Sequence, residues 1–433
     1  MTADDMTAAL VERRRRLLGP AYRLLYDAPL HPVRGEGVWL VEADGRRVLD
    51  CYNNVPSVGH CHPRVVEALS RQAAILNTHT RYLHDTVLDY AERLLATVPA
   101  EIGNVMFTCT GSEANDLAVR VARSVTGHAG FIVTANAYHG VTATVAEMSP
   151  SLGTAVKPGD YVRTVPVPDV YRDGPEGAAA AFTRAVEAAI ASLAEAGMRP
   201  AALLFDTVFA SDGVAVDPPG FVAGAIAAVR AAGGLYIADE VQAGLARTGS
   251  HMWGFERHGV VPDLVTLGKP MGDGHPVAAL LARPEHLAEF GARSRYFNTF
   301  GGNPVSAAVG LAVLDVIRDE NLMDNAASTG RRLHLGMARL AERFPVIGHV
   351  RSAGLYMGVE IVTDAVSRRP SGALAARLVN GLRTQGVLVG VSGPAANVIK
   401  VRPPLPFGAA EVEIVLDRTA RVLGDLEAQG ALT

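Results

Sequence analysis

The chain of 433 residues is poor in cysteine and has little charge of either sign. Its three cysteines, Cys51, Cys61 and Cys109, are too few for a disulfide framework, so we expect a protein of the reducing cytoplasm. Charged residues make up 19% of the chain and the formal net charge is −4. This balance argues against a nucleic-acid partner, because such proteins carry a basic surface that neutralises phosphates.

Long apolar runs are also missing. Stretches such as 221–229 are short and rich in glycine and alanine, so we expect no membrane-spanning helix and no membrane partner. Asp4, Asp5 and Glu12 precede any hydrophobic segment, and we therefore expect neither a signal peptide nor a transit peptide. The sequence contains no internal repeats, low-complexity tracts or Gly/Ser-rich linkers.

Between residues 104 and 282, short β-rich runs alternate with helical patterns. The apolar runs are continuous, which predicts strands covered on both faces. A helix is predicted over Glu113–Val125, with apolar side chains at helical spacing and Gly127 as its stop. Alternating units of this kind predict an α/β fold with a mostly parallel central sheet and helices on both faces. The predicted strands are 105–109, 131–134, 201–205, 235–238, 264–267 and 277–281.

The flanks of this region predict a second domain. Residues 30–50 resemble a hairpin with Asp44-Gly45 as its turn. Beyond about residue 310, two long helices and strands near Val359 and Val398 predict an α+β lobe. We therefore assign 1–60 and 311–433 to a small domain built from both termini, and 61–310 to a large domain.

Two charged residues lie at the ends of predicted strands, where open α/β sheets bind ligands. Lys269 follows the strand 264–267, and Asp239 follows the strand 235–238. Lysine is depleted in strands, so a lysine held there by a glycine-rich turn is unusual. A lysine amine for a Schiff base and an aspartate for a pyridinium nitrogen are what pyridoxal phosphate needs. The alternative is a strand-end lysine that points to water beside a structural aspartate.

Three loops could complete a cofactor site. Gly111 permits a tight turn and Ser112 can cap the next helix, whose N-terminus would bind an anion, although plain capping explains the same pattern. The loop 298–304 is a second candidate for phosphate, or simply a turn. Tyr138 could stack on a planar ring, or be a core aromatic with its hydroxyl in water.

Histidines next to these loops are expected to be structural, and we expect no metal site. His139 follows Tyr138 directly. The run His60-Cys61-His62 offers three metal ligands, but three consecutive side chains of an extended chain cannot converge on one ion.

Taken together, the motifs resemble the class III aminotransferases, which are pyridoxal-phosphate enzymes of the aspartate-aminotransferase fold. The run 238–249, Ala-Asp-Glu-Val-Gln-Ala-Gly-Leu-Ala-Arg-Thr-Gly, looks like the signature of that family. The segments 111–115, 138–140, 268–269 and 299–304 match in the same order. The resemblance extends over nearly the whole chain.

The resemblance implies how the cofactor ring would be held. Lys269 would carry the Schiff base, and Asp239 would pair with the pyridine nitrogen. Tyr138 and Val241 would sandwich the ring, while Gln242 would reach its phenolic oxygen.

The resemblance also implies a phosphate site and a dimer. Gly111 and Ser112 would hold the cofactor phosphate. Thr299 would be contributed by the other subunit of a homodimer with shared active sites.

One departure from the family bears on the substrate. The arginine that usually stands three residues before a Pro-Pro-Leu, and binds a carboxylate, is Lys400 here. The glutamate that often gates this arginine is Ser211. Lysine is a point charge rather than a bidentate fork, and loss of the glutamate leaves the site more cationic. Lys400 with Arg402 and Arg81 therefore suits a dianion such as phosphate, although either arginine could be a surface or interface residue.

Other segments resemble a narrower group, the ethanolamine-phosphate phospho-lyases. These are 50–55, 59–63, 76–85 and 268–276. Asn53 could donate to a substrate phosphate, or be a turn residue. The resemblance implies elimination of phosphate from a phosphorylated primary amine, which for phosphoethanolamine gives acetaldehyde, ammonia and phosphate. The alternative is an amine or ω-amino-acid transaminase, which needs the same lysine.

Overall fold

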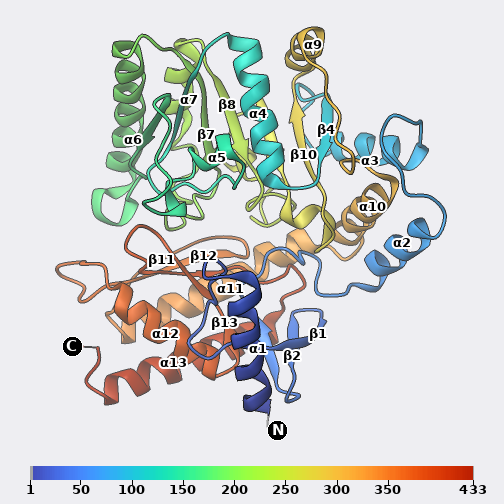
Figure 1. Ribbon diagram of the computed structural model, residues 1–433. Helices are drawn as coiled ribbons and strands as arrows, with labels where there is room; N and C mark the ends of the chain where they lie inside the picture. Colours follow the sequence, from blue (N-terminus) through green and yellow to red (C-terminus); the bar gives the residue numbers. More distant parts are fainter. Residues whose placement is uncertain (1–2, 433) are drawn as a thin grey trace.

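The computed structural model describes residues 3–432, and a seven-stranded sheet forms its centre (Figure 1). The strand order is β4-β10-β9-β8-β7-β5-β6. Neighbouring strands run parallel except around β10, which is antiparallel to both β4 and β9. The prediction of a mostly parallel sheet is confirmed. The strands are β4 (Asn104–Thr108), β5 (Gly130–Thr134), β6 (Val162–Val165), β7 (Pro200–Asp206), β8 (Leu235–Asp239), β9 (Leu264–Leu267) and β10 (Ala278–Ala282).

Strand β6 is the one member of this sheet that the sequence did not predict. It lies at the sheet edge beside β5, where Val162 and Val165 are buried but Thr164 is exposed. An edge strand needs no continuous apolar run, so the pattern that identified its neighbours is missing here.

Helices cover both faces of the sheet, as the sequence predicts (Figure 1). Helix α4 (Gly111–Thr126) packs on one face, and α6 (Val170–Glu195) with α7 (Ala223–Ala231) packs on the other. Successive strand residues therefore enter different cores. Leu204 clusters with Leu117 of α4, whereas Leu203 clusters with Phe182 of α6. Burial on both sides explains why these strands are apolar throughout.

The small domain joins the two ends of the chain below the large sheet in Figure 1. Its first sheet has the order β1-β2-β3-β13, in which β3 and β13 pair in parallel although they are distant in sequence. Its second sheet has the order β11-β12-β15-β14. These strands are β1 (Pro32–Glu36), β2 (Trp39–Glu42), β3 (Arg47–Asp50), β11 (Ile347–Ala353), β12 (Tyr356–Ile361), β13 (Val387–Leu388), β14 (Gly390–Ser392) and β15 (Val398–Val401).

The remaining helices line the outside of both domains or connect them (Figure 1). They are α1 (Ala3–Leu18), α2 (Pro63–Ala73), α3 (Asp85–Leu95), α5 (Ala143–Ala146), α8 (Gly254–Arg257), α9 (Pro284–Arg293), α10 (Pro304–Asp319), α11 (Leu322–Arg343), α12 (Gly372–Thr384) and α13 (Ala409–Ala428). Two short 3-10 helices complete the fold, η1 (Pro150–Leu152) and η2 (Lys269–Gly272).

Helix α6 is longer and more apolar than the sequence analysis expected, since no run of membrane-spanning length was predicted. By length and mean hydropathy it could cross a membrane, and it is the one such helix among residues 3–432. A single candidate of this kind is weak support for a membrane span. Its Phe182, Val186 and Leu193 side chains are buried in the core under the sheet. This buried stripe explains part of its apolar character, since 28% of the apolar window is buried.

Candidate active site

The carboxyl ends of three neighbouring strands meet at one cavity. Strand β7 ends at Asp206, β8 ends at Asp239, and Lys269 follows β9. Asp206 and Asp239 are register partners, so their side chains leave the sheet on the same side. The cavity is lined by Gly111, Ser112, Asn115, Tyr138, His139, Gly140, Asp206, Asp239, Val241, Gln242 and Lys269. The structure therefore brings together every predicted cofactor residue except Thr299.

Lys269 begins the 3-10 helix η2, and its amine has no hydrogen-bond partner among residues 3–432. Burial is the main cause of a lowered pKa for this amine. The carboxylates of Asp239 and Asp206 oppose the shift, while Arg402 adds to it. A lowered pKa increases the fraction of the neutral amine, which is the form that acts as nucleophile or base.

Asp239 is held in place by a buried network behind the cavity. Its Oδ2 lies 2.7 Å from His139 Nδ1 and accepts from Asn115 Nδ2 at 3.0 Å. The second oxygen, Oδ1, accepts from the backbone N–H of Val241 at 3.1 Å. Thr266 in turn donates to Asn115 Oδ1 at 2.6 Å. The sequence analysis gave Asn115 no role in holding Asp239, and it predicted only a structural role for His139.

The start of helix α4 presents free backbone donors to the same cavity. Thr110 is the N-cap residue, and its hydroxyl accepts from the backbone N–H of Glu113. The expectation that Ser112 caps this helix is therefore wrong, because the helix begins at Gly111, two residues before the predicted start at Glu113. The backbone N–H groups of Gly111 and Ser112 have no acceptor in the described chain, as an anion site requires.

Two glycines allow close approach around this helix start. A Cβ at Gly111 would come within 3.0 Å of Val241 Cγ2. Gly140 has a φ of +143°, and a Cβ there would lie 2.5 Å from Ser112 Oγ. Ser112 Oγ accepts a hydrogen bond from the backbone N–H of Val141 at 3.1 Å. Larger residues at Gly111 and Gly140 would crowd the start of the helix. The two glycines therefore leave space for a planar ring with an anionic substituent.

These residues fit pyridoxal phosphate. A free amine, a fixed carboxylate and unpaired N–H groups lie around one cavity, at Lys269, Asp239 and Gly111–Ser112 respectively. Tyr138 and Val241 also line the cavity. Their stacking on either side of a ring stays a prediction.

A second group of cations lies beside Lys269. Lys400 in β15 and Arg402 just after it are only 8% and 6% exposed. The Lys400 side chain makes no hydrogen bond or ion pair with any described residue. The pKa of the Lys400 amine lies well below its ordinary value. Burial is the main cause, Arg402 and Lys269 add to the shift, and Asp206 opposes it. A bound dianion would restore the charged form of this lysine.

Lysine is scarce in this chain, which makes the grouping more informative. The sequence contains three lysines, Lys157, Lys269 and Lys400. Two of the three lie close together, because the charge of Lys269 helps to lower the pKa of Lys400.

Arg402 is fixed by neutral partners rather than by an acid. Its Nη1 donates to Asn54 Oδ1 at 3.0 Å and to Gln242 Oε1. Tyr356 also donates to Gln242 Oε1, at 3.2 Å. Buried Arg402 Nε has no partner among residues 3–432. The Gln242 oxygen is thus engaged with Arg402 and Tyr356, and its contact with the phenolic oxygen of a cofactor stays a prediction.

Asn53 occupies a turn next to this group. Its Oδ1 accepts from the backbone N–H of Val55, and its own N–H donates to Asp50. The neighbouring Asn54, which the sequence did not single out, is the residue that touches Arg402.

Arg81 and Thr299 lie away from the cavity within this chain. Arg81 is exposed and its guanidinium stacks on Phe297, 3.9 Å from the ring centroid. Thr299 is exposed on the loop before α10. Neither lines the cavity. Their predicted roles therefore depend on a second copy of the chain.

Comparisons with known proteins agree with this site. The pattern of the family described as aminotransferase class-III matches residues 25–423. A phospholyase from Arthrobacter, solved in complex with phosphoethanolamine, is 43% identical. It has a TM-score of 0.93, and the match covers 96% of this chain and 100% of that one.

Two curated relatives carry different names. A Drosophila melanogaster protein named alanine–glyoxylate aminotransferase 2-like is 41% identical, covering 92% of this chain and 83% of its own. The Caenorhabditis elegans ethanolamine-phosphate phospho-lyase homolog 1 is 35% identical, covering 92% of this chain and 89% of its own. The family pattern spans nearly the whole chain, and the cavity offers the lysine, aspartate and anion site that pyridoxal phosphate needs. This protein therefore belongs to the class III aminotransferase family of pyridoxal-phosphate enzymes.

Proposed function

We propose that this protein is a phospho-lyase that eliminates phosphate from a phosphorylated primary amine, with phosphoethanolamine as the first candidate. The observation that carries the proposal is Lys400, a buried cation with no anionic contact that lies near Arg402 and Lys269. A buried unpaired cation is costly unless a ligand supplies the opposite charge. The Arthrobacter phospholyase bound to phosphoethanolamine supports the same substrate class.

The residues of the chain divide the chemistry between them. When bound, pyridoxal phosphate accepts the electron pair left on the amine-bearing carbon after deprotonation. Lys269 Nζ removes the proton from that carbon, for which its lowered pKa suits it. Asp239, held by His139 and Asn115, would pair with the pyridine nitrogen of the bound cofactor.

Phosphate leaves from the neighbouring carbon while Lys400 and Arg402 bind its oxygens. The bond between that carbon and the phosphate oxygen breaks, and the oxygen takes the bonding electrons. The released enamine then reacts with water to give an aldehyde and ammonia. For phosphoethanolamine the products are acetaldehyde, ammonia and inorganic phosphate.

A transaminase is the second candidate, because the relative from Drosophila melanogaster is named as an aminotransferase. Both reactions need Lys269, so this lysine does not discriminate between them. The anion site does, since a transaminase of simple amines has no use for a buried Lys400 without an acid partner.

We further propose that two copies form a homodimer with shared active sites. The segment 75–88 and the loop 297–300 expose large apolar side chains, including Leu83 at 96% and Phe300 at 70%. Exposed apolar surface of this extent favours a protein partner. Thr299 and Arg81 lie in these segments, so a second copy could carry them to the neighbouring cavity. The three free cysteines support a cytoplasmic location.

The test is release of inorganic phosphate. Purified protein supplied with pyridoxal phosphate is incubated with phosphoethanolamine, and free phosphate and acetaldehyde are measured together. We expect equal amounts of both products. Lys269→Ala should remove the activity while the melting temperature shows a folded protein. Absence of phosphate release above that variant, together with amino transfer from an unphosphorylated amine to pyruvate, would replace the lyase by the transaminase.

A further inference from the structure

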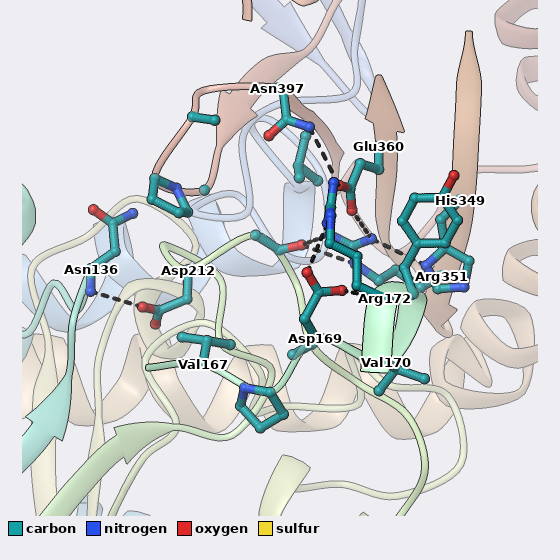
Figure 2. Close-up of a pocket in the computed structure, with 18 of the residues that line it drawn as sticks. Asn136, Val167, Asp169, Val170, Arg172, Asp212, His349, Arg351, Glu360 and Asn397 are labelled. Atoms are coloured by element: carbon teal, nitrogen blue, oxygen red, sulfur yellow. Dashed lines mark hydrogen bonds and ion pairs between the residues drawn. The ribbon is translucent and has the colours of Figure 1, made fainter. Parts of the chain in front are cut away.

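A second cavity lies between the two domains, and it shares no lining residue with the cofactor cavity (Figure 2). Its volume is about 430 Å³, within the range of small-molecule sites. The large domain contributes the segments after β5, β6 and β7, with Asn136, residues 166–172 and residues 212–217. The small domain contributes residues of β11 and β12 and the turn before β15.

Both arginines that line this cavity are already committed to partners (Figure 2). Arg172 donates to Asp169 Oδ2 at 2.7 Å and lies 2.8 Å from Glu360 Oε1. Arg351 pairs with Glu360 Oε2 at 2.8 Å, and it also donates to the carbonyl of Val214 at 2.6 Å. These cations have little capacity left for an anionic ligand.

The walls also hold hydrogen-bond acceptors that are not fully used. Asp212 accepts from the Thr134 hydroxyl at 2.7 Å and from the backbone N–H of Asn136 at 3.0 Å. It has no cationic partner among residues 3–432. Burial raises its pKa to about 6, so it is a carboxylate at neutral pH. A carboxylate has about four acceptor positions, which leaves room for a further donor.

Two amide oxygens add to this acceptor set. The Asn397 side chain is 4% exposed, and its Nδ2 donates to the carbonyl of Ile361 at 2.9 Å. The Nδ2 of Asn136 donates to the carbonyl of Ser211. Because both nitrogens are used, each Oδ1 is left without a donor in the described chain. Around them the wall is largely aliphatic, with Val167, Val170, Ala215, Val216 and Val398.

We propose that this interdomain cavity binds a protonated aliphatic primary amine. The ammonium group would donate to Asp212 and to the free amide oxygens of Asn136 and Asn397. The hydrocarbon part would lie against the aliphatic wall. Ammonium carries three donors and no acceptor, which matches the unpaired acceptors that these walls offer. The proposal concerns a site other than the cofactor cavity and does not depend on the substrate proposed for that cavity.

The test is isothermal titration with n-butylammonium chloride. The holoenzyme is first reduced with borohydride, so that the active-site lysine no longer exchanges its bound cofactor for an added amine. We expect saturable binding of one butylammonium per chain and none of 1-butanol, which has the same shape but no charge. Asp212→Asn should weaken binding at least tenfold. Asp417→Asn, at an exposed position on α13, should leave it unchanged.

A second variant covers the case in which Asp212→Asn does not fold. Val167→Phe places a larger side chain in the cavity and leaves every acceptor in place, so it should also weaken butylammonium binding tenfold or more. Lack of binding by the wild-type protein overturns the proposal. So does binding that persists in both variants, because the amine then binds elsewhere.

Discussion

His139 Nδ1 lies 2.7 Å from Asp239 Oδ2, and both residues line the cofactor cavity. Both side chains are buried, and Asn115 donates to the same oxygen at 3.0 Å. The aspartate expected to meet the cofactor nitrogen is thus held by neighbouring side chains. Its position depends on the loop after β5, on α4 and on β9 as well as on its own strand.

Replacement of His139 by Phe should lower kcat by about 10- to 100-fold, because a hydrogen bond to a charged group contributes about 1.5–3 kcal/mol. The measurement is the rate of phosphate release together with the affinity for added pyridoxal phosphate. His128→Phe is the matched control, since its Nδ1 contacts the Pro200 carbonyl at the opposite end of the sheet. Equal losses in both variants would assign His139 to folding alone.

Lys400→Met tests the phosphate site. We expect the KM for phosphoethanolamine to rise about tenfold or more, since charge-assisted hydrogen bonds contribute about 1.5–3 kcal/mol. Turnover of an unphosphorylated amine should change little. Thermal stability should rise, because a buried amine without a hydrogen-bond partner is replaced by an apolar side chain.

Lys157→Met is the control for this experiment, because it removes the exposed lysine of the three. It should change neither KM nor stability. A normal KM for phosphoethanolamine in Lys400→Met would place the substrate phosphate elsewhere.

The raised pKa of Asp273 predicts that the free energy of unfolding depends on pH. Burial raises its pKa from 3.8 to about 8, while its Oδ1 accepts from the backbone N–H of Val58. Between these two values the folded chain holds a proton that the unfolded chain has lost. This contribution to stability is complete below about pH 4 and is lost as the pH rises to about 8.

Asp273→Asn should therefore be more stable than the wild type at pH 8, by on the order of 1 kcal/mol. Asn keeps the acceptor for Val58 and tolerates the φ of +48° at this position. Melting temperatures at pH 5 and pH 8 give the comparison. Asp44→Asn, in the exposed β2–β3 turn, should leave the pH dependence as it is, and the same behaviour in Asp273→Asn would contradict the assignment.

Leu83→Asp tests the proposed dimer. A charge in an apolar interface is costly, so we expect the mass in solution to fall from dimer to monomer, with loss of activity. Light scattering after gel filtration gives the mass. Val366→Asp is the control, because Val366 is 94% exposed in the small domain and Leu83 is 96% exposed. A monomeric wild-type protein would refute the dimer and the shared active site.

Local patterns in the sequence were sufficient for the fold class and for the position of Lys269 at the end of a strand. Runs such as 201–205 are apolar throughout because both sheet faces are covered, and this pattern needs no knowledge of partners. Lys269 was conspicuous because a lysine at a strand end contradicts local propensity. The direction of β10 was not predictable, since alternation and burial are the same in parallel and antiparallel strands.

Contacts between distant segments were decided by tertiary structure alone. Asn54 and Arg402 are 348 residues apart in sequence, yet they share a hydrogen bond, while the adjacent Asn53 forms a turn. The sequence identified Lys400 as a substitution, but only the fold shows that it is buried without an acid. Sequence patterns indicate whether a residue is buried and which residues within a few positions share its face. Partners in space depend on strand order and domain packing, which bring together groups that no local pattern relates.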